Sequence, residues 1–129
     1  MSAQGRRVLV IGGETTVGRA IVIGLAEAGA DVAIASLTAD TKAEFAINSA
    51  LNELWALGRQ GIALAIDSSD AEQVRAAVTR AEAELGPLDL ALVVGEGAAT
   101  EAILPVRTIS IGAGSEPEGA ARAALAALA

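Results

Sequence analysis

The sequence predicts an α/β fold in three layers, with four helices covering about five mostly parallel strands. Short β-branched runs alternate with longer segments of helical periodicity along the chain. Such alternation favours a parallel sheet, because a crossover between parallel strands needs a dozen or more residues and is usually a helix. The 129 residues fit one domain, and a hydrophobic fraction of 53% excludes disorder. We therefore expect a single Rossmann-like domain over residues 1–129.

Five apolar runs predict the strands of this sheet. The first, residues 7–11, reads Arg-Val-Leu-Val-Ile and stops at Gly12 and Gly13. Its lack of polar and apolar alternation is typical of a strand that is buried on both faces. The other four runs lie at residues 31–35, 62–66, 88–94 and 106–111.

Four segments with apolar residues three or four positions apart predict the helices. They lie at residues 16–28, 41–57, 69–85 and 116–128. Gly29, Gly58 and Gly86 follow the first three, where a left-handed cap or a break is expected. The last three helices start with a hydroxyl residue three positions before a Glu, which predicts a capping box. Those pairs are Thr41 and Glu44, Ser69 and Glu72, and Ser115 and Glu118.

The linker at residues 95–105 is short for a covering helix. In a Rossmann-like arrangement we expect the first two helices on one face of the sheet and the third and last on the other. An apolar gap is then expected between the third and last helices, and such a gap marks a protein interface. The sequence leaves open whether the fifth strand pairs parallel beside the fourth.

The composition excludes several classes of function. The chain has no Cys and no His, so we expect no thiolate site and no metal site. Its net charge of −7 and its lack of a basic cluster argue against nucleic acid or an anionic membrane as a partner. No apolar stretch approaches the ~20 residues of a membrane span. A cytoplasmic protein is the expectation.

A glycine-rich turn separates the first strand from the first helix. It contains Gly12, Gly13 and Gly18. Glycines at this place let backbone N–H groups approach a pyrophosphate at the helix N-terminus, where the helix dipole favours negative charge. The turn therefore indicates a dinucleotide or nucleotide site.

Residues 5–97 resemble the N-terminal half of the short-chain dehydrogenase/reductase family. The segments that carry the resemblance are Gly5–Gly13, Gly18–Ile21, Leu25–Val32, Ala65–Asp70 and Leu85–Leu90. The resemblance implies a Rossmann-like fold shortened to one truncated domain, NAD or NADP as cofactor, and a catalytic Ser, Tyr and Lys further along. The chain contains no Tyr, and its one Lys, Lys42, lies in the wrong segment. We therefore assign no catalytic residue.

The chain departs from the family pattern at the cofactor site. The family motif is Thr-Gly-x-x-x-Gly-x-Gly, and Thr16 replaces its middle Gly, so a Cβ is expected to crowd the pyrophosphate. Ser36 and Leu37 stand where the family has an Asp for NAD or an Arg for NADP. Asp67 matches the family's adenine-side Asp, and a turn residue before a helix explains it equally well. The candidate cofactor-binding residues are Gly12, Gly13, Thr16, Gly18, Ser36 and Asp67.

Three functions follow from these observations. The first is a non-catalytic relative of the dehydrogenases that acts by self-association or as the partner subunit of a full-length dehydrogenase. The second is a module that binds NAD, NADP or another nucleotide at a weakened site. The third is an enzyme with a new mechanism, whose candidate groups are Glu14, Glu96 and Glu101 with Thr15 or Ser36.

Two aromatic residues bear on the first function. Phe45 and Trp55 lie ten residues apart on one predicted helix and therefore point to different sides. With Ile47, Leu51 and Leu54 as the core stripe, at least one aromatic ring is expected outside the core. An exposed aromatic ring is a typical interface anchor, while burial at the edge of the core is the alternative.

Overall fold

The computed structural model describes residues 2–129, and residue 1 lies outside the described residues. Its elements are β1 (Arg7–Ile11), α1 (Thr16–Glu27), β2 (Asp31–Ala35), α2 (Thr41–Ala56), β3 (Gly61–Leu64), α3 (Ala71–Leu85), β4 (Leu90–Val94), the 3-10 helix η1 (Thr100–Ala102), β5 (Thr108–Ile111) and α4 (Pro117–Ala127). The predicted α/β fold with five strands and four helices is confirmed. The 3-10 helix η1 lies inside the linker and has no counterpart among the predicted elements.

The five strands form one parallel sheet in the order β3-β2-β1-β4-β5. β5 pairs parallel beside β4, with Thr108 opposite Ala91, so the pairing that the sequence left open is settled. β1 lies at the centre, and all of its apolar residues are buried. Val8 and Val10 belong to the core on one face, and Leu9 and Ile11 to the core on the other.

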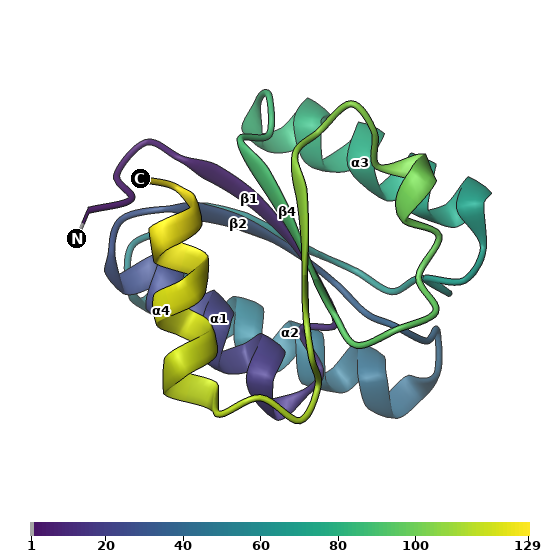
Figure 1. The fold of residues 1–129 in the computed structure, drawn as a ribbon, viewed down its shortest axis with the longest axis horizontal. Coiled ribbons are helices and arrows are strands. Elements are labelled where there is room, and N and C mark those ends of the chain that lie inside the picture. The colour runs from purple at the N-terminus through teal and green to yellow at the C-terminus, as the bar shows by residue number, and fades with distance from the viewer. Residues whose placement is uncertain (1) are drawn as a thin grey trace.

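Helix α4 lies beside α1, on the face of the sheet that α1 and α2 also cover, and α3 covers the opposite face (Figure 1). The prediction that the last helix shares a face with the third was wrong. The right-handed crossover rule determines which face a helix covers only when that helix joins two parallel strands. Helix α4 follows the last strand of the sheet, so the rule does not determine its face. Small residues bring the two helices together, since a Cβ added at Gly24 would lie 3.1 Å from the Cβ of Ala121.

The linker fills the space where an apolar gap was expected. Ala99, Ala102 and Ile103 are buried in the core on the face of α3, together with Val74 and Ala77 of that helix. Ile103 is fully buried. The linker therefore covers the sheet without a full helix. The prediction of an apolar gap between the third and last helices was wrong.

The helix caps differ from the predicted capping boxes by one residue. Carboxylates of Asp40, Asp70 and Glu116 accept first-turn backbone N–H groups of α2, α3 and α4. The predicted caps at Thr41, Ser69 and Ser115 were therefore wrong. An ionised carboxylate is a stronger acceptor than a hydroxyl and also suits the helix dipole, which explains why the acidic neighbour takes each cap.

Both aromatic side chains of α2 lie outside the core. Phe45 is 78% exposed and Trp55 is 55% exposed. The predicted stripe of Ile47, Leu51 and Leu54 is buried against the sheet. The expectation that at least one aromatic ring leaves the core is confirmed.

Candidate functional site

The glycine-rich turn stands at the carboxyl end of β1, where the order of the sheet reverses. β2 pairs with β1 on one side and β4 pairs with it on the other. The chain continues from β1 to β2 in one direction along the sheet, and β4 and β5 extend it in the other. In open α/β sheets the crevice at such a switch point is where ligands bind. The turn and the N-terminus of α1 therefore occupy the expected ligand position.

The turn is held by its own hydrogen bonds and by close backbone packing. Thr15 caps α1: its Oγ1 accepts the N–H of Gly18 at 2.8 Å and donates to the carbonyl oxygen of Gly12 at 2.7 Å. Gly12 has a φ of +104°, in the left-handed region that favours glycine. A Cβ at Gly18 would lie 2.0 Å from the Gly12 oxygen, and one at Gly13 would lie 2.3 Å from a methyl of Ile34. All three glycines therefore have a packing role of their own.

Thr16 is the first residue of α1 and is exposed. The first N–H groups of a helix have no partner within the helix. Because Thr15 takes the N–H of Gly18, the N–H groups of Thr16 and Val17 are the ones at the open end of α1. Thr16 thus carries its Cβ beside the N–H groups that an anionic ligand would use.

Ser36 and Asp67 are both engaged within the protein. Ser36 is fully buried, and its Oγ accepts the N–H of Ile66 at 3.0 Å and donates to the Ile66 oxygen at 3.2 Å. Asp67 is exposed and accepts from the hydroxyl and the N–H of Ser69. The Ser69 hydroxyl, then the Ser69 N–H, lowers the pKa of the Asp67 carboxyl. Ser36 joins β2 to the segment after β3, and Asp67 shapes the turn before α3.

The structure adds Glu14 to this site through a contact that the sequence reasoning missed. The Oε2 atom of Glu14 accepts the N–H of Leu37 at 2.8 Å, so the glycine-rich turn is tied to the backbone after β2. The sequence signal was an acidic residue inside the turn, two positions after Gly12. The other two candidate acids, Glu96 and Glu101, are exposed on the segment after β4.

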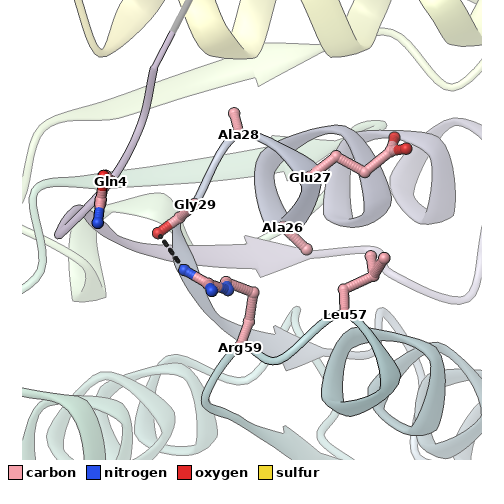
Figure 2. Close-up of a pocket in the computed structure, with 7 residues that line it drawn as sticks. All are labelled: Gln4, Ala26, Glu27, Ala28, Gly29, Leu57 and Arg59. Atoms are coloured by element: carbon pink, nitrogen blue, oxygen red, sulfur yellow. Dashed lines mark hydrogen bonds between the residues drawn. The ribbon is translucent and has the colours of Figure 1, made fainter.

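A hollow lies away from this site, beside the amino ends of β1, β2 and β3. It has a volume of about 470 Å³ and lies between the end of α1 and the segment between α2 and β3. Figure 2 shows Arg59 pointing toward Gly29, whose carbonyl oxygen accepts from Nη1 at 3.4 Å. Arg59 therefore contacts a carbonyl just beyond the C-terminus of α1, which is a structural role.

Across residues 2–129, no cluster of three or more acidic, His or Cys side chains is arranged to hold a metal ion. None of the helices in the described part of the chain has the length and apolar character needed to cross a membrane.

The chain is similar to known dehydrogenases over most of its length. A family model described as short chain dehydrogenase matches residues 6–109. The L-rhamnose 1-dehydrogenase (NAD(P)(+)) of Sphingomonas sp. is 38% identical over 87 residues, which are 67% of this chain and 33% of that protein. The uncharacterized oxidoreductase YhxD of Bacillus subtilis is 37% identical over 108 residues, which are 83% of this chain and 35% of that protein.

Solved structures agree with this match. A blue fluorescent protein from a metagenomic library, in complex with NADPH, superposes with a TM-score of 0.66 at 36% identity, over 71% of this chain and 36% of that one. A 7α-hydroxysteroid dehydrogenase complexed with NADH and 7-oxo glycochenodeoxycholic acid gives a TM-score of 0.66 at 25% identity, over 72% of this chain and 34% of that one. The chain spans about a third of the length of the curated relatives it matches. The strand order and the match over residues 6–109 agree, and the chain belongs to the short-chain dehydrogenase family.

Proposed function

We propose that this chain binds a nicotinamide dinucleotide at its glycine-rich turn and acts through binding rather than by hydride transfer of its own. The observation that carries the proposal is the placement of the turn. It joins the carboxyl end of β1 to the N-terminus of α1 at the switch point of the sheet, which is the ligand position of this architecture. Membership of a family with NADH- and NADPH-bound relatives supports it.

The residues of the turn fit a pyrophosphate in part. Gly12 keeps its left-handed conformation, and α1 presents its first N–H groups toward the crevice. The Cβ of Thr16 is the feature that opposes the ligand, because the family has a glycine there. We therefore infer a weakened site rather than a lost one.

The 129 residues do not supply the Tyr and Lys side chains that the family's catalytic set needs at the matching positions. The chain has no Tyr to serve as the acid of the family's catalytic set. Its one Lys, Lys42, is an exposed residue at the start of α2. A reaction at the bound dinucleotide would need groups from another protein or another polypeptide segment. This is consistent with a partner role beside a full-length dehydrogenase.

Thermal unfolding with NAD, NADP and their reduced forms tests dinucleotide binding directly. A ligand at about ten times its Kd adds about 1.4 kcal/mol to the free energy of unfolding. For a domain of this size that raises the melting temperature by about 5 °C. Each dinucleotide is added at millimolar concentration. A melting temperature that none of the four dinucleotides changes would remove this function.

Replacing Thr16 with glycine is expected to tighten dinucleotide binding by about fivefold, because the Cβ beside the pyrophosphate position is removed. Isothermal titration calorimetry with NAD measures the change. Thr41→Gly is the matched control, since Thr41 is also an exposed Thr at the first position of a helix. An unchanged affinity in Thr16→Gly would show that this Cβ does not obstruct the ligand.

Self-association is a second candidate function, favoured by the surface of α2 and by the edge of the sheet. Phe45 and Trp55 expose large aromatic surfaces on α2. β5 is the last strand in the sheet order and pairs only with β4 among the described strands. Such an edge presents backbone groups that another chain can pair with. We propose a homo-oligomer or a complex with a dehydrogenase as the associated form.

Replacing Trp55 with alanine is expected to disturb assembly more than folding. The side chain is 55% exposed, so its loss should change the free energy of unfolding by about 0.5 kcal/mol or less. Native mass spectrometry reports the number of subunits before and after the change. Leu54→Ala is the control, because truncation of this buried neighbour should lower the free energy of unfolding by about 2–5 kcal/mol. A monomeric wild-type protein, or an unchanged oligomer of low stability, would contradict the interface role.

A further inference from the structure

The carboxylate of Glu14 links the glycine-rich turn to the backbone that follows β2. Its Oε2 atom accepts the N–H of Leu37 at 2.8 Å. Its Oε1 atom is buried and has no hydrogen-bond partner among residues 2–129. The Oε2 atom thus accepts a backbone N–H after β2, while the Oε1 atom accepts no hydrogen bond from the described residues.

The surroundings of Glu14 carry more negative than positive charge. A small pocket of about 170 Å³ lies beside it, and its charged lining residues are Glu14, Asp40 and Lys42. The N–H of Ala43 and then the hydroxyl of Thr38 lower the pKa of the Asp40 carboxyl, so it is ionised at neutral pH. Two carboxylates against one ammonium group make this pocket unfavourable for a further anion.

NAD and NADP differ at one position of the adenosine ribose, which carries a 2′-hydroxyl in NAD and a 2′-phosphate in NADP. In Rossmann folds an acidic residue accepts from that hydroxyl, whereas an Arg accommodates the phosphate. Here Ser36 is buried and bonded to Ile66, and Leu37 has an apolar side chain. The segment after β2 therefore brings neither group, and the carboxylate of Glu14 is the charged group that accepts the N–H of Leu37.

We propose that Glu14 makes this site selective for a dinucleotide with a free ribose 2′-hydroxyl, NAD, and against the 2′-phosphate of NADP. The inference rests on the proposed dinucleotide function. Because Glu14 already accepts the N–H of Leu37, that donor is not available to a phosphate oxygen. Glu14 also places a negative charge beside the position of a second negative group, which costs free energy at short range. An acid supplied by the turn thus replaces the acid that is missing after β2.

Glu14→Gln tests the proposal, because the amide oxygen keeps an acceptor for the Leu37 N–H while the charge is removed. Calorimetric titration with NAD and with NADP is expected to show that the wild-type chain prefers NAD. In Glu14→Gln the affinity for NADP should rise by about tenfold, while that for NAD stays within about twofold. Glu27→Gln is the matched control, since Glu27 is exposed and lines the hollow beside the amino ends of the strands, away from the glycine-rich turn (Figure 2). It removes the same charge and should leave both affinities unchanged.

Salt dependence of the wild-type protein provides a second test that needs no variant. The preference for NAD should weaken as ionic strength rises from about 0.01 M to about 1 M, because salt screens the repulsion. A wild-type preference for NADP, or a preference that neither Glu14→Gln nor salt changes, would overturn the role of Glu14 and leave dinucleotide binding intact. Absence of binding of either dinucleotide to wild type and to Glu14→Gln would overturn the proposed function and this inference together.

Discussion

Replacing Gly18 with alanine is expected to lower the free energy of unfolding by about 3 kcal/mol. The added Cβ would lie 2.0 Å from the carbonyl oxygen of Gly12 and 2.9 Å from the Oγ1 atom of Thr15. The first of these is a backbone atom, so a side-chain rotation cannot relieve the overlap. The turn between β1 and α1 would have to open, and the hydrogen bond from Gly18 to Thr15 would be disturbed.

Urea or thermal unfolding followed by circular dichroism measures this loss. Gly114→Ala is the matched control, because a Cβ at Gly114 meets no atom within 4 Å and its φ lies outside the left-handed region. That variant should stay within about 0.5 kcal/mol of the wild type. Equal stability of the two variants would mean that the turn is looser than its packing indicates. Dinucleotide affinity measured on any folded Gly18→Ala protein should also fall, since the same turn forms the proposed site.

The second large effect is expected at Ile103, in the segment that replaces a covering helix. Ile103 is fully buried against the sheet, and truncation to alanine should cost about 3 kcal/mol. Its neighbour Leu104 is 68% exposed, so Leu104→Ala should change stability by about 0.5 kcal/mol or less.

Comparison of these adjacent variants by chemical denaturation tests whether the linker is part of the core. Similar small losses in both would indicate that residues 95–105 lie loosely on the sheet. Similar large losses would indicate that Leu104 is covered in solution, as it would be in an associated form. The expected result is a large loss in Ile103→Ala alone.

The sequence predicted the sheet well because its signals are local. β1 is a run of Val, Leu and Ile between a charged residue and two glycines, and burial on both faces requires that composition. Alternation of strands and helices then limits the topology to a few parallel orders. These constraints explain why the five parallel strands and the core stripe of α2 were predicted correctly.

The face covered by α4 could not be predicted in the same way. Its position depends on the fit of Gly24 against Ala121, a contact between residues almost a hundred positions apart. The linker was misjudged because it is too short for a covering helix, whereas its apolar residues Ala99, Ala102 and Ile103 pack onto the sheet around a single 3-10 turn.

The position of the glycine-rich turn in the fold was predicted, whereas the side-chain contacts around it were not. Gly12 and Gly18 lie where the motif placed them, and the motif spacing is enough to locate a turn. The bond from Leu37 to Glu14 joins residues 23 positions apart and depends on the side-chain conformation of Glu14, which no local pattern encodes. The same holds for Ser36, because its hydroxyl accepts the N–H of Ile66, a residue 30 positions later that no local pattern pairs with it.

The central position of β1 has a consequence for how the chain is made. β1 pairs on one side with β4, and the N–H of Arg7 is held by Asp89, a residue 82 positions later. Synthesis of that stretch takes roughly 4–16 s at cellular rates of translation. During this interval the nascent β1 has an apolar edge open to β-pairing with other chains, and a parallel partner this distant also slows folding once synthesis is complete. Yield in the cell should therefore depend on how well that edge is shielded before β4 emerges.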